Sequence, residues 1–127
     1  LLAEDVAAYE RYSEASKDKS GSEAAAREKA SALATATAVP MEIVALAAAV
    51  AEGMDRVKEK CNRHLLSDLV VGAVLCDAAA HGAAANVRVN LSLFPDPQES
   101  DRLAEELRAM LAHVRRHRDS VAALAAV

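Results

Sequence analysis

The sequence predicts an all-α protein, a single domain over residues 1–127 built as an up-and-down bundle of about five antiparallel helices. Apolar residues recur at helical spacing, and the β-branched stretches VVGAVL and NVRVNL follow the same helical period. Of the 127 residues, 53% are hydrophobic and 27% charged, as expected for one globular domain. Only 2% are aromatic, so the core must consist of Ala, Val, Leu and Met, which pack best between closely spaced helices.

The first half of the chain contains three predicted helices. The first covers residues 1 to about 16, and the polar segment 17–21 ends it. A second helix follows and consists almost entirely of helix-forming residues. Pro40 removes a helical hydrogen bond but is tolerated in a first turn. We therefore expect a boundary or kink at Ala38–Val39 and a third helix over residues 40–60.

The second half contains a polar corner and two further helices. Residues 61–66 form the corner, and the next helix covers 67–91 without a proline. The sequence Phe-Pro-Asp-Pro at 94–97 ends this helix, because two prolines so close together exclude helical backbone. From about residue 98 to the end, apolar residues recur with the spacing of one amphipathic stripe: Leu103, Leu107, Met110, Leu111, Val114, Val121 and Leu124.

One flank of the 67–91 helix carries little bulk. At about 100° per residue it comprises Asp68, Gly72, Leu75, Ala79, Gly82, Ala83, Asn86 and Asn90. Each glycine costs about 1 kcal/mol relative to alanine, so we expect compensation from the close approach of another helix or of a flat ligand.

Asp68 and Asn86 lie far apart on this helix. They are 18 positions apart, about 27 Å along a straight helix. One copy of the helix therefore cannot bring both to a single small molecule. Either the two ends serve different purposes, or a second chain packs antiparallel, as in a symmetric homodimer.

Composition argues against several classes of partner. No uninterrupted apolar run of about 18 residues occurs, so we expect no membrane span, and no signal peptide is visible. The net charge of −4 gives no electrostatic footprint for nucleic acid. Cys61 and Cys76 lack metal-type spacing, so we expect free thiols in a reducing compartment, the cytoplasm.

Several motifs carry a family resemblance. C-N-x4-S-D-L-x-V-x-A at 61–73 and G-A-x2-N-V-x-V-N-L at 82–91 resemble the C-terminal half of the formiminotransferase-cyclodeaminase and methenyltetrahydrofolate cyclohydrolase family. Residues 5–9 are similar to its D-x-x-A-Y/F helix, and residues 38–41 to its A-V-P-L helix start. The resemblance extends over roughly residues 4–125. The family's glycine-rich T-P-G-G-G-S turn has no counterpart, so we expect that an N-terminal part precedes this numbering.

The resemblance implies folate one-carbon chemistry. One reaction closes 5-formiminotetrahydrofolate to 5,10-methenyltetrahydrofolate and releases ammonia, and the other hydrolyses the methenyl compound to 10-formyltetrahydrofolate. Ser67-Asp68 matches a family pair, which implies that Asp68 is the catalytic acid or base, a role worth about 10²–10⁴-fold in rate. The position of Asp68 near a helix start is equally typical of a carboxylate that stabilises the helix dipole. No cofactor is implied beyond the tetrahydrofolate substrate.

Six residues are candidates for substrate binding: Asp5, Tyr9, Asn62, Ser67, Asn86 and Asn90. The two helical asparagines either bond to another helix or recognise a pterin edge, because a buried unpaired amide costs about 1–3 kcal/mol. Tyr9 either packs in the core or stacks on the ligand, and Asp5 lies on the same helical face. Asn62 either satisfies backbone groups at the corner or faces the substrate.

A metal site is not expected. His113 and His117 have the i, i+4 spacing of a shared ligand face, but no glutamate lies between them. Arg115, Arg116 and Arg118 surround them with positive charge, so we interpret this segment as a solvated face. The alternative to an enzyme is a helical scaffold or oligomerisation module that has kept the fold and lost the reaction. A glycine-rich turn upstream would favour the enzyme.

Overall fold

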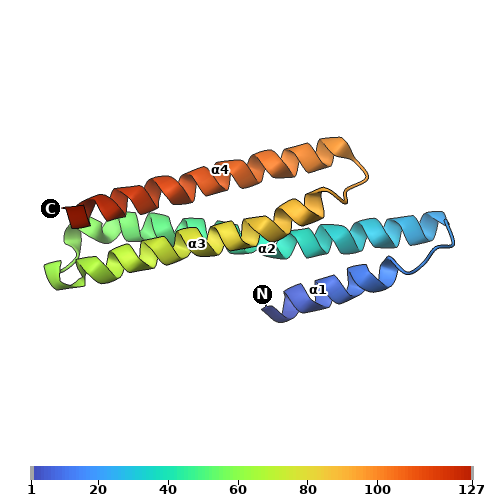
Figure 1. Cartoon of the computed structure of the whole chain (residues 1–127), viewed down its shortest axis with the longest axis horizontal. Coiled ribbons are helices and arrows are strands. Elements are labelled where there is room, and N and C mark those ends of the chain that lie inside the picture. The colour runs from blue at the N-terminus through green and yellow to red at the C-terminus, as the bar shows by residue number, and fades with distance from the viewer. Residues whose placement is uncertain (1, 127) are drawn as a thin grey trace.

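The computed structural model describes residues 2–126, with side chains from residue 3 to residue 124. Within that part of the chain, four long helices form most of the structure and no strand occurs (Figure 1). They are α1 (Leu2–Ala15), α2 (Glu23–Val57), α3 (Leu66–Leu91) and α4 (Pro97–Ala122). Short 3-10 helices lie at Lys58–Lys60, Arg63–Leu65 and Ala123–Ala126. The prediction of an all-α fold is confirmed.

The helices alternate in direction, as short connections require. Figure 1 shows α2, α3 and α4 running up and down beside one another, with α1 antiparallel along the first half of α2. Side chains cap two of the starts. Ser22 accepts a hydrogen bond from the backbone N–H of Ala25 at 3.1 Å, and Asp96 accepts one from Gln98 at 2.9 Å. The predicted polar break and the proline-bearing turn therefore both occur.

One boundary prediction is wrong. α2 runs through Pro40 without interruption, so there is no break at Ala38–Val39, and four long helices replace the expected five. Pro40 has no N–H, which leaves the carbonyl of Ala36 without its usual partner four residues on. The side chain of Asn90 on α3 donates to this carbonyl at 3.1 Å. A hydrogen bond between two helices thus replaces the one that proline removes.

The core lies between α2, α3 and α4 and is built from small and medium side chains. Val44, Val87 and Val114 are fully buried, one from each helix, and alanines fill much of the space between them. Gly72 explains part of the close approach, because a Cβ at this position would lie 2.7 Å from Cε of Met54. As the low aromatic content predicts, the helices pack through Ala, Val, Leu and Met.

A cluster of polar side chains joins the C-terminal ends of α2 and α4. Asp55 forms an ion pair with Lys58 at 2.9 Å and accepts a hydrogen bond from Nδ1 of His117 at 2.7 Å. Lys58 also reaches the side chain of Ser120. Hydrogen bonds from Lys58, Ser120 and His117 hold the pKa of Asp55 well below its usual value of 3.8.

Replacing Asn90 with alanine is expected to lower the free energy of unfolding by about 1–3 kcal/mol, because the Ala36 carbonyl loses its donor in a half-buried place. Pro40→Ala restores the backbone donor, so in that background the same Asn90→Ala change should cost much less. Urea denaturation of the four proteins of this double-mutant cycle measures the coupling. An equal loss of unfolding free energy in both backgrounds would show that Asn90 does not satisfy the Ala36 carbonyl.

Asp55→Asn is expected to reduce stability in a pH-dependent way. A carboxylate whose pKa is lower in the folded state stabilises the fold above its unfolded pKa of 3.8, and this contribution is lost as the pH falls below that value. The difference in unfolding free energy between wild type and variant should therefore persist from about pH 7 to pH 5 and shrink towards pH 3. A difference that stays constant down to pH 3 would mean that the Asp55 charge contributes nothing.

Candidate functional site

A pocket of about 290 Å³ lies between α1 and the C-terminal half of α3, both of which pack against α2. Four of the predicted binding residues line it: Asp5 and Tyr9 from α1, and Asn86 and Asn90 from α3. The remaining lining residues are Tyr12, Ala36, Val89 and Leu93. We call this the α1–α3 pocket. Residues about 80 positions apart in the chain thus meet at one place.

The helical period of α1 explains how its side chains reach this pocket. Ala8 is buried against the bundle, so the residues beside it, Asp5, Tyr9 and Tyr12, lie along the edge of the interface. Tyr9 is 68% exposed, which excludes the interpretation that its ring packs in the core. Asp5 is half-buried.

The α1–α3 pocket offers polar groups beside aromatic rings. Asn90 uses its amide N–H₂ to bind the Ala36 carbonyl and keeps its carbonyl oxygen as an acceptor. Asn86 is exposed and forms no hydrogen bond with any residue that the structure describes. Together with the Asp5 carboxylate and the two tyrosine rings, these groups suit a flat heterocycle with donors and acceptors along its edge.

The other three predicted site residues lie at the opposite end of α3. Asn62 accepts a hydrogen bond from the backbone N–H of His64 at 3.1 Å and caps the short helix at the corner, so the turn interpretation holds for it. Ser67 and Asp68 are exposed in the first turn of α3. Leu65 occupies the N-cap position of this helix. A single chain therefore does not unite Asp68 with the α1–α3 pocket.

The predicted low-bulk flank of α3 is divided between two environments. Asp68, Leu75, Ala79, Gly82 and Asn86 are exposed, whereas Gly72 contacts α2, Ala83 is buried and Asn90 is half-buried. A Cβ at Gly82 would meet no atom of the described residues within 4 Å. Gly72 is thus explained by packing within the chain, and Gly82 is not.

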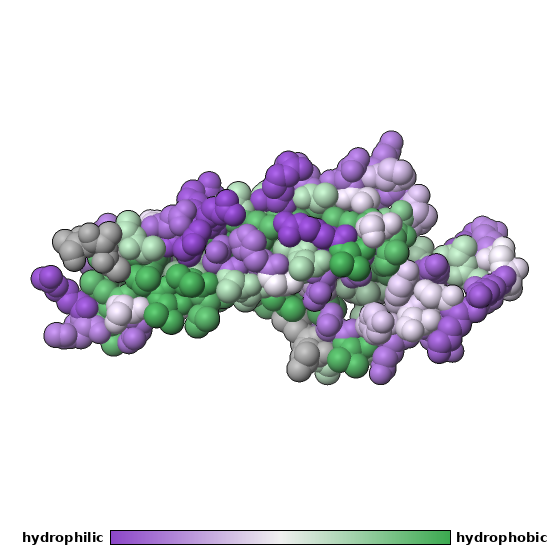
Figure 2. Space-filling view, viewed as in Figure 1, coloured by the Kyte–Doolittle hydropathy of each residue, from purple (hydrophilic) through white to green (hydrophobic). Residues whose placement is uncertain are grey.

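Apolar side chains continue from this exposed flank onto α2. Figure 2 shows apolar surface over the first half of α3, where Val71, Val74 and Leu75 are exposed. A shallow groove of about 330 Å³ runs between the two helices. Its lining comprises Ile43, Leu46, Ala47, Val50, Leu75, Cys76 and Ala79.

Length and composition alone would allow two segments to cross a membrane. The most apolar 18-residue windows within Glu23–Lys60 and Arg63–Leu91 have mean hydropathies of 1.8 and 1.4. Core helices of soluble bundles pass the same test, and 44% of the first window is buried inside the bundle. Only 11% of the second window is buried, so the apolar residues of that window largely face outward. The expectation that no segment spans a membrane stays a prediction.

Several features of the site are not visible in sequence spacing. Ala36, Val89 and Leu93 line the α1–α3 pocket but carry no chemical signal of their own. Glu52 lies beside the histidine pair His113 and His117, although 61 positions separate it from the nearer histidine. Only the parallel packing of α2 beside α4 brings these three together. Both cysteines are free thiols, as expected.

Comparison with known proteins gives two matches. The family model described as formiminotransferase-cyclodeaminase matches residues 1–109. Among solved structures, the crystal structure of formiminotetrahydrofolate cyclodeaminase from Thermotoga maritima superposes with a TM-score of 0.83 at 29% sequence identity. That match covers 93% of this chain and 57% of the other. The comparison with curated proteins finds no match.

The chain therefore spans little more than half the length of its structural relative. The shared fold and the motifs at both ends of α3 nevertheless agree with the family model, which includes the whole of α1, α2 and α3. On this basis, the chain belongs to the formiminotransferase-cyclodeaminase family.

Proposed function

We propose that this chain is an enzyme of folate one-carbon metabolism. It either converts 5-formiminotetrahydrofolate to 5,10-methenyltetrahydrofolate with release of ammonia, or hydrolyses 5,10-methenyltetrahydrofolate to 10-formyltetrahydrofolate. The observation that carries the proposal is the α1–α3 pocket, where Asp5, Tyr9, Asn86 and Asn90 meet. Membership of the family and the likeness to a solved cyclodeaminase support it.

The pocket residues match the chemistry of a pterin ring. Its edge carries ring nitrogens, an amino group and a carbonyl, which pair with the amide of Asn86 and the carboxylate of Asp5. The Tyr9 ring is exposed beside them and offers a stacking surface to the flat face of the ligand. In this arrangement, the one-carbon unit extends from the ring along α3.

Both reactions require a group that moves a proton near the one-carbon unit. In the cyclisation, N10 attacks the formimino carbon, the C–N bond to ammonia breaks, and the departing nitrogen takes a proton. In the hydrolysis, water attacks the methenyl carbon and the bond from this carbon to N5 breaks. The formyl group stays on N10, and of the two protons of the water one goes to N5 and one is released. We assign this proton transfer to Asp68, a carboxylate in the exposed first turn of α3.

We further propose that the enzyme works as a homodimer, because one chain holds Asp68 and the pocket at opposite ends of α3. The exposed apolar groove of α2 and α3 is the surface that a second copy would cover. A two-fold axis between Ala78 and Ala79 places Leu75 opposite Gly82 of the partner subunit. Leu75 is 63% exposed, and Gly82 leaves open space for it.

The same axis completes the site. In a near-antiparallel pairing, it brings Asp68 of the partner subunit level with Val89, within one helical turn of Asn86 and Asn90. Each pocket then combines the binding residues of one chain with the acid–base group of the other. The proposed partners in the reaction are thus the folate substrate and a second copy, and the reaction needs no nucleic acid, membrane or further cofactor. We place the enzyme in the cytoplasm.

Asp68→Asn is expected to abolish turnover of both folate substrates without lowering the melting temperature, because the side chain is exposed in the single chain and asparagine has nearly the same size. Absorbance assays with formimino- and methenyltetrahydrofolate side by side measure the loss and decide between the two reactions. Asp101→Asn, an exposed carboxylate on α4, is the matched control and should keep full activity.

Folinic acid serves as the binding probe in the same experiment. It should raise the melting temperature of wild type and of Asp68→Asn alike, because the α1–α3 pocket is intact in both. A wild-type protein that binds folinic acid but turns over neither substrate would favour the scaffold alternative. A protein that neither binds nor reacts would refute the folate proposal.

Gly82→Leu is expected to convert the dimer to a monomer, because the added side chain occupies the space that Leu75 of the partner subunit needs. The fold should be unaffected, since a Cβ at this position meets nothing within 4 Å in the described chain. Adding Leu75→Ala exchanges the large and small residues and should restore dimerisation. Light scattering after size-exclusion chromatography measures the mass, and a dimer that tolerates Gly82→Leu would contradict the proposed pairing.

A further inference from the structure

A cluster of one carboxylate and two imidazoles lies between α2 and α4, away from the α1–α3 pocket. Nε2 of His113 is 3.3 Å from Oε2 of Glu52, and the rings of His113 and His117 are 4.4 Å apart between centroids. One donor atom from each of the three side chains lies within 4.8 Å of the others. All three residues are partly buried. The cluster is therefore reachable from solvent and held between two packed helices.

The hydrogen bonds leave a lone pair available on His117. Nδ1 of its ring donates to Oδ2 of Asp55 at 2.7 Å, which keeps the proton on Nδ1 and the lone pair on Nε2. Asp55 is itself fixed by Lys58 at 2.9 Å. A carboxylate that orients a histidine through its second nitrogen is the usual support of a metal-binding imidazole.

The spacing of Glu52 and His113 already matches a metal site. Metal–nitrogen and metal–oxygen bonds of about 2.1 Å at a tetrahedral angle place two ligand atoms about 3.4 Å apart. The observed 3.3 Å between Nε2 and Oε2 is long for a hydrogen bond and close to that ligand separation. Both side chains are about one-third exposed or more, so they have room to rotate and close the remaining distance to His117.

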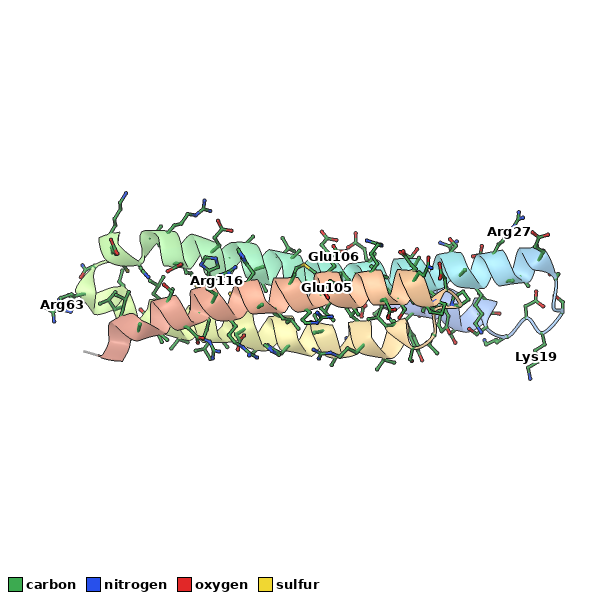
Figure 3. The ribbon with its side chains drawn as sticks, turned by 90° about the horizontal axis from the view of Figure 1, so that it is seen from above. Lys19, Arg27, Arg63, Glu105, Glu106 and Arg116 are labelled. Atoms are coloured by element: carbon green, nitrogen blue, oxygen red, sulfur yellow. The ribbon has the colours of Figure 1, made fainter. Side chains whose placement is uncertain are left out.

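The positive charges nearby are mostly turned away. Arg118 lies 3.7 Å from Asp77 and 2.8 Å from Asp119, and Arg115 is exposed. Two arginines contact the cluster. Nη2 of Arg116 donates to Nδ1 of His113 at 3.1 Å, and Arg56 forms an ion pair with Oε1 of Glu52 at 3.9 Å, which leaves Oε2 facing His113. Figure 3 shows Arg116 on α4 near α2. Of the positively charged side chains nearby, the two that contact the cluster, Arg56 and Arg116, are both exposed and can turn into solvent.

We propose that Glu52, His113 and His117 bind a divalent transition-metal ion, with Zn²⁺ as the representative, and that the bound ion clamps α2 to α4. Two imidazoles and one carboxylate are borderline ligands that suit this class of ion. Water fills the remaining coordination position. On binding, His113 exchanges the proton on Nε2 for one on Nδ1, and Arg116 moves into solvent. This site is independent of the proposed folate chemistry.

Titration of the full chain with Zn²⁺ alone, against a chromogenic chelator, tests the proposal. We expect one ion per chain, bound with a Kd in the micromolar range or tighter. Glu52→Gln, His113→Ala and His117→Ala should each weaken binding at least tenfold. Asp55→Asn should weaken it about 10–100-fold without removing a ligand. The matched controls Glu59→Gln and His81→Ala, which alter the same residue types outside the cluster, should bind as wild type does.

A variant of Arg116 is expected to change the Zn²⁺ affinity in the opposite direction, which makes it a more specific test. Arg116→Ala removes a positive charge and the donor that occupies Nδ1 of His113, so it should tighten Zn²⁺ binding. Arg115→Ala removes a positive charge that does not contact the cluster, so it should leave Zn²⁺ binding unchanged. Circular dichroism checks that each variant is folded. Binding that is equally sensitive to His81→Ala, or insensitive to Glu52→Gln in a folded variant, would show adventitious surface binding only and overturn the proposal.

Discussion

The unbroken course of α2 through Pro40 is the constraint on which the rest of the structure depends. Proline frees the carbonyl of Ala36, and Asn90 of α3 satisfies it from the side. Because α2 is continuous, its first half carries α1 and its second half packs against α3 and α4 (Figure 1). Ala36 and Asn90 also line the α1–α3 pocket. The hydrogen bond between Asn90 and the Ala36 carbonyl thus also positions two residues that line the candidate site. Asn90, a predicted substrate-binding residue, therefore also stabilises the fold.

In a single chain, part of the exposed flank of α3 has no packing partner among the described residues. Gly72 is explained by Met54, but Gly82, Leu75 and the apolar groove beside them face solvent. Glycine within a helix costs about 1 kcal/mol relative to alanine, so an unexplained one indicates a contact outside the chain. A second copy in antiparallel orientation accounts for the glycine, for the exposed leucine and for the distance between Asp68 and the pocket. One assumption therefore explains three separate observations.

Much of this was predictable from local sequence, and the remainder required tertiary contacts. Helix periodicity and the Phe-Pro-Asp-Pro turn gave α3 and α4 nearly to the residue. The predicted helix break at Ala38–Val39 was wrong because Asn90, the donor that replaces the hydrogen bond lost at Pro40, lies 54 positions from Ala36 in the sequence. Asp5 and Asn86 were predicted as separate candidates but not as neighbours, since they line one pocket only because α1 and α3 both pack against α2. Glu52 could not be predicted as a neighbour of His113 and His117 for the same reason, because no sequence spacing connects a carboxylate on α2 with a histidine pair on α4.

Subunit complementation tests most directly whether the folate site is shared between two chains. Asp68→Asn and Asn86→Leu should each be inactive as pure proteins, because every site lacks one of its two halves. Mixing them in equal amounts with exchange of subunits should restore about one quarter of the wild-type activity, since half of the dimers are mixed and each mixed dimer has one intact site. If mixed dimers form and activity stays at zero, both groups act within the same chain, and the shared site is excluded.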